Sequence, residues 1–140
     1  MGRKRKNNHY VNNEDFMKEI ILYHETGKYS DELWIMFYDI AKNYATKSKF
    51  NRNYSLLDDM ITNAVLRCLR YINSFNYKEQ FNPFAYFTTV IHNSFLQTIA
   101  KEKIQEKKKW KELGRLIEDY VDENQIQIKI PHSIMEKINE

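Results

Sequence analysis

The sequence predicts an all-α fold: a compact bundle of about four to five helices followed by a short extended C-terminal tail. Three observations predict it. The 140 residues include only three Gly and two Pro, too few for the many turns of an all-β fold. Leu, Ile, Lys and Glu are common, a composition that favours helices. Apolar side chains also recur at three- and four-residue steps over long stretches, which gives a helix one apolar face.

The composition indicates one folded domain. Hydrophobic residues make up 42% of the chain and charged residues 29%, and the mean hydropathy is −0.72. This length is enough for a modest core. No apolar run approaches the roughly 20 residues that span a bilayer, and we identify no signal peptide. Cys68 is the single cysteine, which excludes an internal disulfide framework and favours a buried small hydrophobe. We therefore expect a protein of a reducing cytoplasm.

Charge is distributed unevenly along the chain. The formal net charge is only +3, yet residues 101–115 carry seven basic and three acidic side chains, and residues 118–123 are acidic. Salt screens exposed charges over roughly 8 Å, so local patches decide binding. We divide the chain into a basic flexible arm (residues 1–9), a helical domain (10–110), and a C-terminal helix with its tail (111–140).

Two helices are expected in the first third of the chain. The first spans about residues 12–25 and stops at Gly27. The second spans about residues 30–47 and has an acidic first turn, which complements the helix dipole. We expect its aromatic rings, including that of Trp34, in the core. A polar, basic connector at residues 47–53 follows.

The third predicted helix, about residues 55–73, has two different faces. Ser55 with Asp58 three residues later resembles a capping box at its start. One face is apolar and is expected to pack inward. On the other face, Leu66 and Leu69 have polar neighbours, which indicates either a protein-binding surface or packing on the N-terminal helix. The second face comprises Asp59, Thr62, Asn63, Leu66, Leu69 and Arg70.

The central helix is predicted to begin at Asn82-Pro83, because Asn caps helix starts and Pro is tolerated in the first turn. Its apolar face consists of Phe84, Phe87, Ile91, Phe95 and Ile99. The opposite face carries an aromatic ring, amides and small side chains, where a solvated face would carry Lys and Glu. These residues are Tyr86, Thr89, Val90, Asn93 and Gln97.

A basic segment continues this helix. It contains Lys101, Lys103, Lys107, Lys108, Lys109, Lys111 and Arg115. An aromatic ring and amides that lead into a row of ammonium groups suit stacked bases followed by phosphates. A wet protein interface is the alternative interpretation of the polar face.

The C-terminal residues predict two further short elements. Residues 113–120 have the spacing of a short helix, and Ile residues alternate with polar ones over 126–130, which predicts an extended segment. Pro131 ends that segment. Residues 133–140 form either a helical turn or a peptide that docks on another molecule.

No pattern typical of an enzyme is present. The four His residues are scattered without ligand spacing, and the chain has neither a phosphate-binding Gly loop nor a nucleophile elbow. Asp58 and Asp59 point in different directions on a helix, so they do not form a catalytic pair. Asp119, Asp122 and Glu123 favour a solvated acidic face over a cation site. We expect no catalytic residue, metal or cofactor.

Two adjoining segments resemble region 2 of bacterial RNA polymerase sigma factors. Asp59-Met60-Ile61 matches its acidic-apolar start, Phe75-Asn76-Tyr77 its Phe-Asp-like turn, and Ala85-Tyr86 its Tyr after a small residue. These matches keep their order and spacing without a gap. The resemblance covers roughly residues 10–110, and the small late-gene sigma factors of tailed phages are the most similar group. The start of the first helix, Asn82-Pro83 and the Lys-Glu-Lys run support that similarity.

The resemblance implies two binding faces. The second face of the third helix, as defined above, would bind the coiled coil of the largest subunit of the host RNA polymerase core. The central helix would bind the non-template strand of a −10-like, AT-rich promoter element. Tyr86 matches the family's stacking Tyr, and Asn93 occupies the position of an amide that reads an upstream base; Asn suits adenine. The implied DNA-binding residues are Tyr86, Thr89, Val90, His92, Asn93, Gln97, Lys101, Lys103, Lys107 and Lys108.

The chain also departs from the family pattern. Primary sigma factors carry two Trp where this chain has Thr89 and Val90, which fits an easily opened promoter or help from a partner. No second DNA-binding helix-turn-helix follows, so we expect no −35 recognition. Late phage sigma factors end in a peptide that binds the replication sliding clamp. Ser133-Ile134-Met135 with Ile138 is a weak version of it, which implies a sliding clamp or coactivator as a further partner.

The expected function is therefore that of a phage-type late-transcription sigma factor in the host cell cytoplasm. It would bind polymerase core and recognise and melt the −10-like element. The alternative is a helical polymerase-binding regulator, an anti-sigma or appropriation factor, that does not read DNA.

Overall fold

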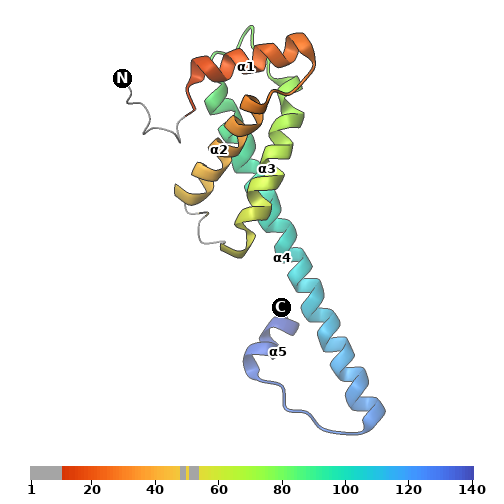
Figure 1. The fold of residues 1–140 in the computed structure, drawn as a ribbon. Helices are drawn as coiled ribbons and strands as arrows, with labels where there is room; N and C mark the ends of the chain where they lie inside the picture. Colours follow the sequence, from red (N-terminus) through yellow and green to blue (C-terminus); the bar gives the residue numbers. More distant parts are fainter. Residues whose placement is uncertain (1–10, 48–49, 51–53) are drawn as a thin grey trace. The chain divides into compact units, whose positions relative to one another are not determined.

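The computed structural model describes residues 11–47, 50 and 54–140. Within these ranges the chain forms five α-helices and no β-strand, which confirms the predicted all-α class. None of the described helices is long and apolar enough to cross a membrane. The predicted basic arm, and the predicted connector apart from residues 47 and 50, lie outside the described residues. The helices are α1 (Asn13–Thr26), α2 (Asp31–Lys47), α3 (Leu57–Tyr71), α4 (Pro83–Asn124) and α5 (His132–Ile138) (Figure 1).

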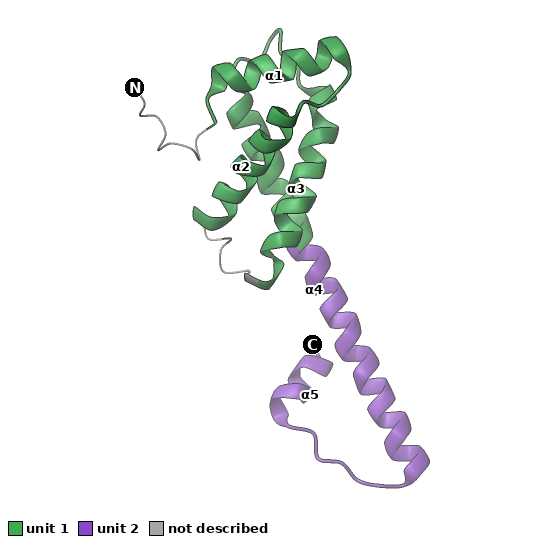
Figure 2. Ribbon diagram, in the orientation of Figure 1, with its two compact units in different colours: residues 1–98 green, residues 99–140 purple. Residues whose placement is uncertain are grey.

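The chain divides into two compact units, residues 1–98 and residues 99–140 (Figure 2). The long helix α4 contributes to both of them. Its side chains that enter the core of the first unit end at Phe95. From the sequence, the helical domain was predicted to end at Trp110, whereas the first compact unit of the structure ends at Thr98.

Aromatic rings fill the centre of the first unit. Phe16 of α1, Phe37 of α2 and Phe87 of α4 are fully buried. Their ring centres lie 4.9–5.6 Å apart in edge-on and tilted contacts, the arrangement that aromatic quadrupoles favour. Cys68 of α3 is buried as predicted, and burial raises the pKa of its thiol. Three helices are thus joined through one aromatic cluster, with α3 packed against α2.

Two rings predicted for the core lie at the surface instead. The side chain of Trp34 is 42% exposed and that of Phe84 is 40% exposed. Each is adjacent in sequence to a residue that is buried, Leu33 and Pro83 respectively. One residue turns a helix by about 100°, so the side chain that follows a buried one points along the edge of the core or out of it.

Of the two asparagines at the start of α1, one caps α1 and the other fixes the start of α4. Asn12 caps α1, because its Oδ1 accepts two backbone N–H groups of the first turn. Asn13 Oδ1 accepts the backbone N–H of Phe84 at 3.1 Å, and its Nδ2 donates to Asn82 Oδ1 at 3.1 Å. Asn82 Oδ1 in turn accepts the N–H of Ala85 at 3.0 Å. The predicted helix start at Asn82 is confirmed, and α1 is joined to it.

We expect Asn13→Ala to lower the melting temperature, because it removes both the cap on Phe84 and the link to Asn82. Loss of a helix cap costs about 1 kcal/mol, which corresponds to roughly 4–8 °C in a domain of this size. Circular dichroism melting measures it. Asn13→Asp keeps the acceptor and should recover part of the loss. An unchanged melting temperature in Asn13→Ala would show that the link is not a structural element.

Helix α3 begins without the predicted capping box. A 3₁₀ turn, η3 (Tyr54–Leu56), precedes it, so Leu56 occupies the cap position and makes no side-chain cap bond. Ser55 lies inside this turn and cannot cap, which makes the Ser55–Asp58 prediction wrong. A second 3₁₀ turn, η4 (Ile72–Ser74), follows α3. There Asn73 Oδ1 accepts the Tyr23 hydroxyl at 2.8 Å, so α1 lies across the end of α3 (Figure 1).

In the second unit, the separate helix predicted at residues 113–120 proves to be part of α4, which continues unbroken to Asn124. Gln125 then adopts a left-handed conformation, with φ of 51°. Residues 126–131 form neither helix nor strand, and α5 follows. The helical interpretation of residues 133–140 is therefore the one that agrees with the structure.

Gly114 lets α5 approach α4 closely. A Cβ added at this glycine would lie 2.6 Å from Ile138 Cγ2, well inside van der Waals contact. Beside this contact, Lys137 Nζ lies 5.4 Å from the ring centre of Trp110, within cation–π range. The short helix is therefore seated on α4 at the one position in that stretch that has no side chain.

We expect Gly114→Ala to have two opposite effects. Alanine stabilises a helix interior by up to about 1 kcal/mol over glycine, but its methyl group would displace Ile138. Hydrogen exchange measured by mass spectrometry should therefore slow in α4 and accelerate in α5. The double variant Gly114→Ala/Ile138→Ala restores the space and should slow α5 exchange again. Unchanged exchange in α5 of the single variant would contradict this packing.

Candidate functional site

A cavity of about 590 Å³ is formed by α3 and the first half of α4. All five residues that the sequence assigned to the polar face of α4 line it. They are Tyr86, Thr89, Val90, Asn93 and Gln97. Leu96 of α4 and two residues of α3, Arg67 and Tyr71, complete the wall. The helical repeat of three and four residues explains why the α4 side chains converge.

The ring of Tyr86 is held by its neighbours. Its centre lies 5.0 Å from that of Phe75 and 4.9 Å from that of Phe87, both in edge-on contacts. Burial raises the pKa of Tyr86, and the nearby Tyr71 raises it further. At neutral pH the side chain is therefore an uncharged ring with a hydroxyl that can donate or accept. Such a fixed ring is a stacking platform at small entropic cost.

Three polar side chains of the cavity wall are free to bind a ligand. In the part of the chain that the structure describes, the side chains of Arg67, Asn93 and Gln97 form no hydrogen bond or ion pair with another residue. Asn93 and Gln97 are exposed, and Arg67 is half-buried. Val90 is buried and gives the wall an apolar part. The site therefore combines apolar surface with two unpaired amides and one guanidinium group.

His92 does not join the other predicted DNA-binding residues. It follows the buried Ile91 on α4, about 100° around the helix from Asn93. Its Nδ1 lies 2.6 Å from the Tyr44 hydroxyl oxygen, and its ring centre lies 5.5 Å from that of Phe50. The His92 ring is therefore bound within a cluster with Tyr44 and Phe50 and does not line the cavity.

The predicted phosphate-binding lysines belong to the second unit. Lys101, Lys103, Lys107 and Lys108 are exposed. None of these four ammonium groups pairs with a carboxylate in the described residues. Arg115 differs, because it binds Glu112 at 2.6 Å and Asp119 at 3.0 Å, and its hydrogen bond lowers the pKa of Glu112. The four lysines thus keep charge available for phosphates, whereas Arg115 is engaged.

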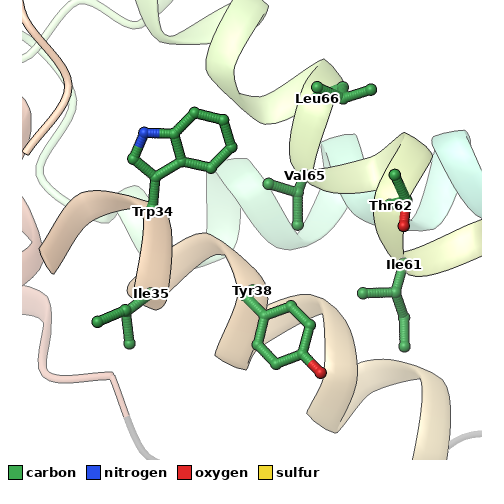
Figure 3. Close-up of a pocket in the computed structure, with 7 residues that line it drawn as sticks. All are labelled: Trp34, Ile35, Tyr38, Ile61, Thr62, Val65 and Leu66. Carbon is green, nitrogen blue, oxygen red and sulfur yellow. The ribbon is translucent and has the colours of Figure 1, made fainter. Parts of the chain in front are cut away.

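A second surface is an apolar groove of about 330 Å³ between α2 and α3 (Figure 3). Its large side chains are substantially exposed, and Leu66 reaches 50%. An apolar groove exposed on a helical pair is typical of a protein-binding site. It is lined by Trp34, Ile35, Tyr38, Ile61, Thr62, Val65 and Leu66. Of the α3 residues in this lining, only Thr62 and Leu66 were predicted for a protein-binding face. The α2 residues were not predicted, because Trp34 was expected in the core.

Leu69, one of the residues assigned to polymerase binding, is buried and does not belong to the exposed protein-binding surface. Its side chain is only 6% exposed, and its carbonyl oxygen accepts the Tyr29 hydroxyl at 2.8 Å. Thr62 and Leu66 are the two predicted polymerase-binding residues that line the groove. Asp59, Asn63 and Arg70 are exposed on α3 outside its lining, and Asn63 Nδ2 donates to Thr98 Oγ1 at 3.2 Å.

No protein-family model matches the chain, and no curated protein matches it. Its function is therefore inferred from the chemistry of the two surfaces of the first unit. One is a cavity with a fixed ring and unpaired polar groups. The other is an almost wholly apolar groove.

Proposed function

We propose that this chain is a sigma-type transcription factor that directs a phage host's RNA polymerase core to late, AT-rich promoters. The cavity that contains Tyr86 and Asn93 carries the proposal. Promoter opening needs a pocket for a base that leaves the duplex and a surface that replaces its lost stacking. Unstacking costs a few kcal/mol, and stacking on an aromatic side chain returns roughly 1–3 kcal/mol per base.

The dimensions and chemistry of the cavity support this role. Its volume of about 590 Å³ lies within the range of small-molecule sites, roughly 300–1,000 Å³. Tyr86 supplies the ring, and the unpaired amide of Asn93 suits the adjacent donor and acceptor of adenine. Thr89 and Val90 replace the bulky wedge of primary sigma factors, so the promoter would have to melt easily or a partner would have to help.

The apolar groove between α2 and α3 supports polymerase binding. Trp34 and Leu66 flank a surface onto which one helix of a coiled coil can lay its apolar side chains. In this proposal the groove binds the coiled coil of the largest polymerase subunit. The groove and the cavity have no lining residue in common, so each function can be removed separately.

The C-terminal tail has a proposed partner of its own, a sliding clamp or coactivator. Met135 and Ile138 of α5 are the apolar side chains that such a partner would take. Ile138 is packed at Gly114 in the second unit. A partner that binds this peptide therefore has to displace α5 from α4 first.

The alternative, a polymerase-binding regulator that does not read DNA, needs the groove but not the cavity. Two measurements on the full chain separate the two functions. Capture of purified RNA polymerase core on the immobilised chain is expected for both. Salt-dependent binding of single-stranded AT-rich DNA is expected for the sigma factor alone. Capture without DNA binding would favour the regulator, and no capture of core would exclude both.

A further inference from the structure

The α3 side of the cavity offers two further side chains to a ligand. Arg67 and Tyr71 are four residues apart on α3 and therefore share one face of that helix. Both line the same cavity as Tyr86 and Asn93. The α3 side of the cavity thus carries one aromatic ring and one cation.

Tyr71 is a second ring available to a ligand. Its side chain is 38% exposed, so stacking would not require the core to open. It also lies close enough to Tyr86 to act on that hydroxyl electrostatically. The Tyr86 ring is held against Phe75, whose side chain is fully buried. The ring of Tyr86 is therefore held in place by the core, whereas the ring of Tyr71 has exposed surface.

Arg67 is a cation without a counter-ion. It is half-buried, and among the described residues no carboxylate pairs with it. A charge that loses part of its hydration without gaining a partner is unfavourable. An anion at the cavity wall would remove that penalty. The planar guanidinium fork matches phosphate oxygens in a two-point contact.

We propose that Tyr71 and Arg67 complete a nucleotide clamp, in which the base is held between Tyr71 and Tyr86 and Arg67 binds the phosphate of the same strand. The inference rests on the proposed function and adds the α3 wall to it. It also explains how small residues at Thr89 and Val90 are compatible with strand capture. The aromatic surface they lack is supplied from the neighbouring helix.

The test uses the full chain and a fluorescein-labelled, single-stranded AT-rich oligonucleotide, with binding followed by fluorescence anisotropy. Tyr71→Ala should weaken binding about 5- to 150-fold, the range that loss of one aromatic stacking contact produces. Tyr71→Phe keeps the ring and should bind like the unmodified chain. Tyr120→Ala, which removes a more exposed ring from the second unit, is the control and should have no effect.

Arg67 is tested by the salt dependence of the same binding. Arg67→Gln should lower the slope of log K against log salt by about 0.7, the value for one phosphate contact on a single strand. Lys18→Gln removes one exposed positive charge from α1, outside both surfaces, and should leave the slope unchanged. Tyr71→Ala should weaken binding without changing the slope.

The outcomes separate this inference from the proposed function. If Tyr86→Ala weakens binding but Tyr71→Ala and Arg67→Gln bind as tightly as the unmodified chain, the clamp is overturned and the proposed function stands. If the unmodified chain does not bind the oligonucleotide, or no cavity variant weakens binding, both are overturned. Melting curves of each variant establish that it is folded. If Tyr71→Ala is not folded, Tyr71→Leu removes the ring but keeps a large apolar side chain, and it should weaken binding in the same way.

Discussion

Tyr86→Ala should lose most promoter opening while it retains polymerase binding. The substitution removes a ring that is held against Phe75 and lines the cavity. Base stacking on such a ring is worth roughly 1–3 kcal/mol, so opening should fall about 5- to 150-fold. Permanganate reactivity of promoter thymines, measured with reconstituted polymerase, reports the opening. Capture of polymerase core by the same variant should be unchanged, since Tyr86 does not line the apolar groove.

Tyr86→Phe is the matched control. It keeps the ring and removes only the hydroxyl, so thymine reactivity should stay close to that of the unmodified chain. Tyr86→Ala also loses contact with two buried rings, so its melting temperature has to be measured alongside. Unchanged thymine reactivity in a folded Tyr86→Ala variant would contradict the assignment of the cavity to DNA.

Leu66→Asp should strongly weaken polymerase binding. Leu66 is half exposed in a groove with almost no polar surface. Its replacement would place an unpaired carboxylate at the interface, and an unpaired buried charge is strongly unfavourable. Substitution of a central interface residue costs about 2 kcal/mol or more, which weakens capture of core roughly 30-fold or more. Surface plasmon resonance with immobilised core measures the loss.

Leu116→Asp is a control of equal exposure. Leu116 is also 50% exposed, but it lies on α4 in the second unit. The same change of charge there should leave polymerase capture intact, and both variants should melt near the unmodified chain, since exposed positions contribute little to stability. If both variants lost polymerase capture equally, or if neither lost it, the groove would not be the docking surface.

The faces of single helices were predictable from the sequence, because they depend on the helical repeat alone. The α4 residues from Tyr86 to Gln97 converge on one cavity for this reason. The helix start at Asn82 was predictable from local chemistry, since Asn caps and Pro is tolerated in the first turn. The residues that one helix contributes to a site can thus be predicted from the sequence of that helix alone.

The residues that a second helix or a loop contributes to the same site were not predictable in this way. Arg67 and Tyr71 join the cavity only because α3 packs beside α4, and no local pattern in α3 indicates it. Leu69 is buried, and its carbonyl oxygen accepts the hydroxyl of Tyr29, forty residues earlier in the chain. Likewise, His92 is bound by Tyr44. Each of these contacts depends on how distant segments pack, which periodicity does not encode.

In the proposed function, the groove and the cavity are separate surfaces with separate roles. A competition assay tests this separation: promoter opening by the unmodified chain and polymerase core is measured while a variant is added in excess. Tyr86→Ala should inhibit, because it occupies polymerase without opening DNA, whereas Leu66→Asp should not inhibit. Inhibition by both variants, or none by Tyr86→Ala, would contradict the account.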